Sequence, residues 1–208
     1  MKNKKNGFVS MQSGNSDISE AKYELRRRTL AKRGHLDETT RQEFSNSIVK
    51  SLTLSPIFGQ AATIHIYLSF GSEVNTEKLI AAAWTAGKRV ATSIVLRDSP
   101  DLAHAIVLPD TRFVKGIFGV PTPINVQLLT AEQLGLTNFD IIIVPLTAFD
   151  KFCNRLGYGR GYYDRFLAKT AARRIGFGFA LQEAADIPAE PTDVQLDFIF
   201  TEIDVIAR

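Results

Sequence analysis

The chain has the length and composition of an ordinary globular protein. It contains 208 residues, of which 45% are hydrophobic and 23% are charged, and both fractions are average for soluble proteins. This length favours one domain with a substantial core. No run approaches the roughly 18 apolar residues of a membrane helix, and the polar N-terminal segment lacks the apolar stretch of a secretory signal. We therefore expect a cytoplasmic protein that has no membrane partner.

Positive charge is concentrated near the N-terminus, although the net charge is only +3. Residues 1–33 carry nine Lys or Arg and three acidic residues. Such a basic arm can bind RNA or membrane lipid, and it can equally lie over a polyphosphate or a polyglutamate tail. The segment lacks the interleaved basic and aromatic residues with which proteins stack on bases. We therefore expect no nucleic acid partner.

Cys153 is the only cysteine, which excludes an intramolecular disulfide and a metal cluster built on cysteines. A catalytic thiol usually requires a base close by, and the neighbouring sequence supplies none. We therefore expect no catalytic role for this thiol.

The N-terminal third is predicted to be a disordered tail followed by two helices. Residues 1–16 are polar and poor in apolar side chains, which is typical of disorder. Asp17 and Glu20 have the spacing of a capping box, so the first helix and the domain, residues 17–208, are expected to begin there. This helix should end near residue 33, before Gly34. A second helix begins after Asp37, and its apolar stripe consists of Phe44, Ile48, Val49 and Leu52.

Beyond residue 60, predicted strands alternate with helical segments. Residues 139–144 form a continuous apolar run that is typical of a strand buried on both faces, whereas the Pro-rich residues 109–138 are expected to be irregular. The alternation predicts an α/β fold: a single domain with three layers, in which helices cover both faces of a mostly parallel sheet. The other expected elements are strands at 62–68, 89–96, 102–108, 174–179 and 198–201 and a helix at 76–86.

A glycine-rich segment at residues 154–165 is the strongest functional signal. Its glycines, at positions 157, 159 and 161, allow a tight turn and a close approach of backbone amides to a ligand. Arginines stand at positions 155, 160 and 165, and a helical pattern begins at Gly161. Amides, a helix N-terminus and arginines together favour a phosphate, and Asp164 in the first helical turn is placed to hold Mg²⁺ against it. Taken alone, the glycine spacing fits a simple turn before a surface helix equally well.

Residues 144–164 resemble the signature of the 5-formyltetrahydrofolate cyclo-ligases, also called 5,10-methenyltetrahydrofolate synthetases. The signature reads Pro-x-x-Ala-Phe-Asp and then Asn-Arg-Leu-Gly-x-Gly-x-Gly-Tyr-Tyr-Asp, whereas a Walker loop is absent. Weaker similarity extends in order from Lys22 to Asp197. The resemblance implies an ATP- and Mg²⁺-dependent enzyme that converts 5-formyltetrahydrofolate to 5,10-methenyltetrahydrofolate, ADP and phosphate. We expect such an enzyme to act as a monomer.

The resemblance also implies an ATP site. Lys22-x-x-Leu25-Arg26 is similar to the N-terminal element that contacts the ATP phosphates in the family, although spacing alone fits a solvated helix face. Lys22, Arg155 and Arg160 are the implied catalytic residues. The implied ATP-binding residues are Lys22, Arg26, Arg155, Leu156, Gly157, Tyr158, Gly159, Arg160, Gly161, Tyr162 and Tyr163.

The folate and metal sites are implied in the same way. Leu68, Glu73 and Tyr162 match substrate-binding positions, and a carboxylate suits the N–H donors of a pterin edge. Asp164 and Asp193 match the aspartates that hold Mg²⁺. Without the resemblance, Glu73 is a loop acid near a helix start and Asp193 a turn residue.

The chain departs from the family pattern at two positions. Leu146 stands where glycine is frequent, which could reshape the rim of the pocket, and Thr122 stands where many members have a glutamate. Two other functions therefore stay open: a folate-binding protein without turnover, and an ATP-using enzyme of related fold with another substrate.

Overall fold

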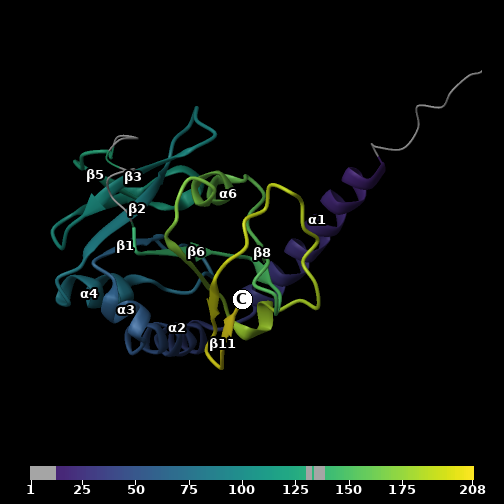
Figure 1. Cartoon of the computed structure of the whole chain (residues 1–208), viewed down its shortest axis with the longest axis horizontal. Coiled ribbons are helices and arrows are strands. Elements are labelled where there is room, and N and C mark those ends of the chain that lie inside the picture. The colour runs from purple at the N-terminus through teal and green to yellow at the C-terminus, as the bar shows by residue number, and fades with distance from the viewer. Residues whose placement is uncertain (1–12, 130–132, 134–138) are drawn as a thin grey trace, which may run out of the picture.

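The computed structural model describes residues 13–129, 133 and 139–208, and within them a seven-stranded sheet has the order β11-β10-β9-β6-β1-β2-β3 (Figure 1). Neighbouring strands from β10 to β2 run parallel, and only the outer strands β11 and β3 are antiparallel. The predicted mostly parallel sheet is therefore confirmed. The strands are β1 (Thr63–Ile66), β2 (Arg89–Val95), β3 (Leu102–Val107), β6 (Ile141–Pro145), β9 (Arg173–Phe177), β10 (Phe198–Phe200) and β11 (Val205–Ala207).

Helices cover both faces of this sheet, which confirms the predicted three layers. On one face, α2 (Glu38–Thr53), α3 (Pro56–Gln60) and α4 (Glu77–Thr85) enclose a core of buried aliphatic and aromatic side chains. On the other face, α6 (Tyr162–Leu167) encloses a second core (Figure 1). None of the helices within the described residues is long and apolar enough to cross a membrane.

Helix α2 forms as its sequence predicts. Asp37 caps it by accepting a hydrogen bond from the Thr40 amide at 2.9 Å. Of the predicted apolar stripe, Ile48, Val49 and Leu52 are buried against the sheet, and Phe44 packs beside them. A capped helix with one apolar face is therefore docked on the sheet by ordinary hydrophobic packing.

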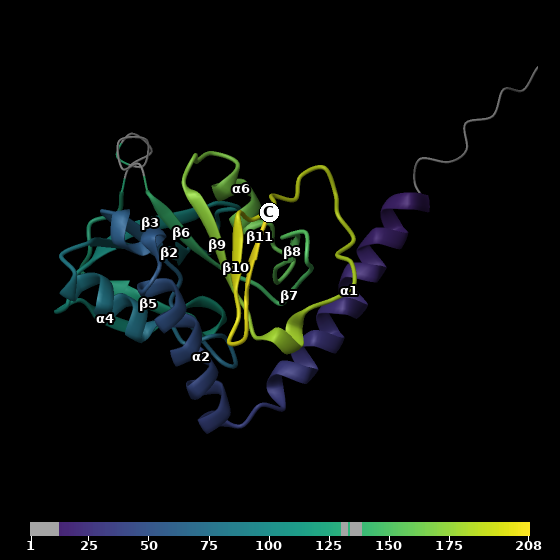
Figure 2. The ribbon, with the colours of Figure 1, turned by 60° about the horizontal axis from the view of Figure 1, so that its bottom comes forward.

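Helix α1 (Ser13–Gly34) differs from the prediction and from α2. It begins at Ser13, so Asp17 lies inside the helix and is not its cap, and of the predicted tail only residues 1–12 lie outside the described part. The helix stands at the edge of the molecule, against β7 (Ala148–Phe149), β8 (Arg155–Leu156) and the 3-10 turn η2 (Ala180–Gln182) (Figure 2). Its buried residues are Lys22, Leu25, Thr29 and Arg33.

The Pro-rich segment is more regular than predicted. Strands β4 (Arg112–Lys115) and β5 (Pro121–Ile124) pair as an antiparallel hairpin, and the 3-10 turn η1 (Ile117–Gly119) connects them. The expectation of irregular structure is therefore wrong for this part of residues 109–138, of which 130–132 and 134–138 lie outside the described residues. Proline is tolerated here because each strand of a two-stranded ribbon has a free edge, where no amide donor is required.

Leu146 does not reach the pocket rim as expected, because its side chain is buried in the core. It lies over two glycines, Gly176 and Gly178. A Cβ atom on Gly176 would stand 2.8 Å from Leu146 Cδ2, and one on Gly178 would stand 2.8 Å from Leu146 Cδ1. The Leu146 side chain therefore fills the space in the core where side chains at positions 176 and 178 would otherwise lie.

We predict that Gly178→Ala lowers the free energy of unfolding by about 1–3 kcal/mol, because the new methyl group overpacks a filled core. It would meet Leu146 and also the Phe149 ring, whose nearest carbon is at 3.0 Å. Urea unfolding followed by fluorescence measures the effect. Gly59→Ala is the matched control, since nothing lies within 4 Å of its added methyl group. Equal stability of both variants would contradict the packing argument.

Candidate active site

A cavity opens at the carboxyl ends of the central parallel strands. Its walls come from the residues after β1, from Ser93 and Val95 of β2, from Pro145 of β6 and from the glycine loop, residues 157–161. The chain leaves β1 through α4 toward β2 and leaves β6 through α6 toward β9, so the connections that follow these two neighbouring strands lead in opposite directions along the sheet. Open α/β sheets bind ligands at such a switch point, and the glycine loop lies there.

The glycine loop brings helix α1 close to the cavity. Gly159 has φ +92° and Gly161 has φ +66°, a region that favours glycine. A Cβ atom on Gly159 would stand 3.2 Å from the Arg26 guanidinium, which itself donates to the Gly157 carbonyl at 2.8 Å. Because α6 has only six residues, its dipole contributes less to an anion site than the loop amides and the cations do.

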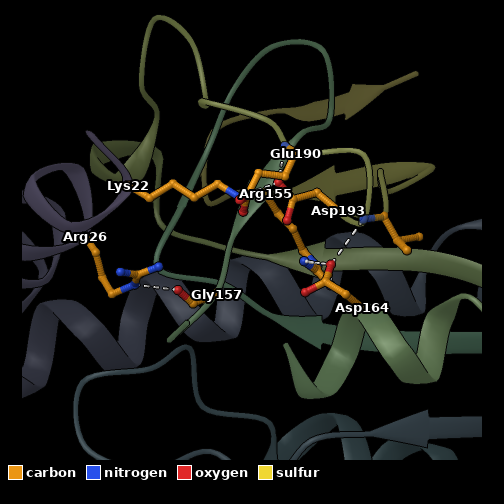
Figure 3. A network of polar contacts seen from close by, with 8 residues as sticks. Lys22, Arg26, Arg155, Gly157, Asp164, Glu190 and Asp193 are labelled. Carbon is orange, nitrogen blue, oxygen red and sulfur yellow. Dashed lines mark hydrogen bonds and ion pairs between the residues drawn. The ribbon is translucent and has the colours of Figure 1, made fainter. Parts of the chain in front are cut away.

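Arg155 and Asp164 form a partly buried ion pair beside the cavity. Both Nη atoms of Arg155 donate to Asp164 Oδ1, at 3.0 and 2.9 Å, and the Arg155 side chain is only 3% exposed. The Val194 amide donates to the same oxygen at 3.1 Å (Figure 3). The pair therefore fixes the first turn of α6 against β8 and the C-terminal segment that follows η2.

Lys22 reaches from α1 to the same region, where two carboxylates bind it. Its ammonium donates to Asp193 Oδ2 at 2.5 Å and to Glu190 Oε2 at 2.6 Å (Figure 3). Burial lowers the pKa of Lys22, but its hydrogen bonds to Asp193 and Glu190 outweigh this effect and raise the pKa. Lys22 therefore stays charged and holds α1 to the loop that carries Asp193.

Asp164 and Asp193 are suitable oxygen ligands for Mg²⁺. The hydrogen bonds described for Asp164 all go to Oδ1, so Oδ2 can serve a metal. Within the described residues no cluster of three or more His, Cys, Asp or Glu could hold a metal ion. A site of two carboxylates completed by phosphate oxygens is the usual Mg²⁺ arrangement for nucleotide chemistry, and the donor set fits it.

Glu73 lines the same cavity, as do Leu68 and Tyr162. Its side chain is buried and accepts a hydrogen bond from the Phe70 amide at 3.1 Å. Burial raises the pKa of Glu73 to about 7, although the Phe70 amide and the Arg33 guanidinium oppose this shift. The carboxylate can therefore change its charge near neutral pH.

Five of the remaining predicted site residues line the cavity: Tyr158, Gly159, Arg160, Gly161 and Tyr163. Arg160 is exposed, and its guanidinium lies 5.2 Å from the centre of the Phe118 ring.

Leu156 does not line the cavity. Its side chain packs in a small cluster with Leu25, Ala148 and Ile187, and its carbonyl accepts from Thr147. Cys153 is also buried, and burial raises the pKa of its thiol to about 11.

The sequence does not predict two acids that organise the site. Glu190 binds the Lys22 ammonium together with Asp193. The only feature of the sequence that points to Glu190 is its position three residues before Asp193. Asp150 ends the Pro-x-x-Ala-Phe-Asp element and accepts from the amides of Phe152, Asn154 and Ile187. It therefore joins the turn before β8 to the segment after η2, which no local pattern reveals.

Along most of its length the chain is similar to one family of enzymes. The model of the 5-formyltetrahydrofolate cyclo-ligase family matches residues 18–202. The chain belongs to this family. It is therefore an enzyme of the ligase class that forms a C–N bond.

Individual relatives and a solved structure match a large part of this chain. A 5-formyltetrahydrofolate cyclo-ligase of Haemophilus influenzae is 36% identical over 66% of this chain and 74% of the relative. One from Escherichia coli K12 is 29% identical over 82% and 94% of the two chains. The NMR structure of 5,10-methenyltetrahydrofolate synthetase from Aquifex aeolicus superposes with a TM-score of 0.76 at 28% identity, and covers 89% of this chain and 92% of its own.

We predict that Asp150→Ala lowers the free energy of unfolding by at least about 2 kcal/mol, because buried amide donors lose their acceptor. Chemical denaturation measures this loss. Asp98→Ala, which removes an exposed carboxylate, should change stability by no more than about 0.5 kcal/mol. If Asp150→Ala is as stable as this control, the three amides do not depend on Asp150.

Proposed function

We propose that the protein converts 5-formyltetrahydrofolate to 5,10-methenyltetrahydrofolate and uses ATP and Mg²⁺ to do so, with release of ADP and phosphate. The observation that carries this proposal is the composition of the cavity lining. The same cavity is lined by a buried carboxylate, Glu73, and by the glycine loop with Arg155 and Asp164. A pterin edge offers N–H donors and a triphosphate offers anionic oxygens, so the carboxylate and the cations of the lining are complementary to the two substrates.

The chemistry requires an activated oxygen and no protein nucleophile. An amide oxygen is a poor leaving group, so the formyl oxygen first attacks the γ-phosphate of ATP. N10 then attacks the formyl carbon of the resulting N5-iminium phosphate, the ring closes and phosphate leaves. Such a reaction depends on alignment of the substrates and on neutralisation of the phosphate charge.

The cations near the cavity suit this task. Lys22 and Arg26 extend from α1, Arg155 lies beside Asp164, and Arg160 is exposed at the rim. We propose that they bind the triphosphate together with the backbone of the glycine loop, while Leu68, Glu73 and Tyr162 bind the folate. Asp164 and Asp193 would hold Mg²⁺, which supplies charge neutralisation to the phosphates when it is bound.

The decisive experiment mixes the purified protein with Mg-ATP and 5-formyltetrahydrofolate and follows the absorbance of the methenyl product. We expect a rise in absorbance that requires all components and is matched by ADP release. Binding of 5-formyltetrahydrofolate without product would indicate a folate-binding protein. ATP binding without any affinity for the folate would indicate another substrate.

We predict that Asp164→Asn lowers turnover at limiting Mg²⁺ by at least about a hundredfold, because an amide holds the cation far less well than a carboxylate. Turnover is measured as a function of Mg²⁺ concentration. The affinity for 5-formyltetrahydrofolate, measured by calorimetry, should stay near that of the wild type and serves as the control for folding. Activity close to wild type at low Mg²⁺ would show that Asp164 does not bind the metal.

We predict that charge removal separates the two halves of the cavity. Glu73→Gln should weaken 5-formyltetrahydrofolate binding and spare ATP binding, whereas Lys22→Met should do the reverse. Loss of a charged hydrogen-bond partner costs roughly 1.5–3 kcal/mol, which corresponds to about ten- to a hundredfold in affinity. Calorimetric titration of each ligand into each variant measures the effect. A loss of both affinities in both variants would indicate unfolding, and an unchanged folate affinity in Glu73→Gln would remove Glu73 from the folate site.

A further inference from the structure

Arg33, near the C-terminal end of α1, joins three segments around the cavity. Its guanidinium is buried and donates to the Tyr158 hydroxyl at 2.8 Å, to Ser72 Oγ at 3.0 Å and to the Leu146 carbonyl at 3.2 Å. These partners belong to the glycine loop, to the loop that carries Glu73 and to the end of β6. A planar guanidinium with donors on three sides is suited to such a junction.

Tyr158 continues this junction toward Glu73. Its ring lies 5.7 Å from the ring of Phe70, centre to centre, and the Phe70 amide donates to the Glu73 carboxylate at 3.1 Å. Both Tyr158 and Glu73 line the cavity. The tyrosine therefore connects the glycine loop to the loop that carries Glu73, and its hydroxyl accepts a hydrogen bond from Arg33.

We propose that Arg33 is a positioning residue for the reaction: through Tyr158 and Ser72 it holds the Glu73 carboxylate in place for a pterin. The inference rests on the proposed function as far as the pterin is concerned. The junction itself is a property of the folded chain without ligands, so it can be tested separately.

The charge of Glu73 depends on this junction. Four side chains from the elements around the cavity interact electrostatically with the carboxylate: Arg33 from α1, Tyr158 from the glycine loop, Tyr67 after β1 and Tyr163 from α6. Of these four, only Arg33 is a cation. Burial raises the pKa of Glu73, while the Phe70 amide, the Arg33 charge and the Tyr158 hydroxyl lower it, which leaves the pKa at about 7.

The expected pH dependence follows directly. A pterin edge donates hydrogen bonds, so it binds the ionised form of Glu73 better than the protonated form. Affinity for 5-formyltetrahydrofolate should therefore rise with pH through the pKa of Glu73 and level off above it. Loss of the Arg33 charge or of the Tyr158 hydroxyl disfavours the ionised form, so either change should move this rise to higher pH.

The test titrates Glu73 in the free protein by NMR, with ¹³C-labelled glutamate side chains and Glu73→Gln to assign the signal. We expect a midpoint near pH 7 in the wild type. In Tyr158→Phe, which keeps the ring against Phe70, the midpoint should rise by about one pH unit. Tyr162→Phe removes a neighbouring hydroxyl of the same cavity and should leave the midpoint unchanged. An unshifted midpoint in Tyr158→Phe would overturn the proposal.

A second measurement connects the junction to the substrate. Calorimetric affinity for 5-formyltetrahydrofolate, taken across the neutral pH range, should follow the NMR midpoints in the wild type and in Tyr158→Phe. Arg33→Met should also raise the midpoint of the Glu73 titration, provided that its melting curve shows a folded protein. If this variant does not fold, the result for Tyr158→Phe decides the question. An NMR shift without any folate binding would sink the proposed function and leave the junction intact. Folate binding that is independent of pH would overturn the role of the junction in binding.

Discussion

The site depends on the way in which helix α1 is bound to the rest of the molecule. Its buried side includes two cations, Lys22 and Arg33, in addition to Leu25 and Thr29. Lys22 binds two carboxylates, and Arg33 binds two hydroxyls and a carbonyl. Since a buried cation without partners is very costly, these contacts specify the position of the helix more strictly than hydrophobic packing alone.

This mode of docking places cations where the sheet leaves room for a ligand. The parallel strands supply a rigid crevice between β1 and β6, but the strand ends themselves contribute few charges. Positive charge arrives from outside the sheet, from α1 and from β8, which carries Arg155. Sheet and helix therefore have separate tasks: the sheet shapes the cavity, and the helix supplies much of its charge.

The central part of the fold could be predicted because its signals are local. Runs of β-branched residues predict the parallel strands, and glycine spacing with arginines predicts the loop that precedes α6. The β4–β5 hairpin could not be predicted, because proline normally argues against a strand and only the two-stranded ribbon makes it harmless. The contact of Lys22 with Glu190 joins segments far apart in the chain, and no local pattern encodes such a pair. For the same reason the sequence identifies Arg33 only as a residue at the end of a helix and does not predict its contacts.

Leu146 and the two glycines beneath it share a single volume of the core. The leucine fits because Gly176 and Gly178 have no side chains; a methyl group on Gly176 would also meet Leu196, and one on Gly178 would also meet Phe149. Substitutions at these positions are therefore coupled during evolution. A smaller residue 146 lowers the cost of a side chain at position 176 or 178, but Leu196 or Phe149 must adjust as well. Neutral drift at this end of the sheet is therefore slowed, because a tolerated change at one position depends on changes at its neighbours.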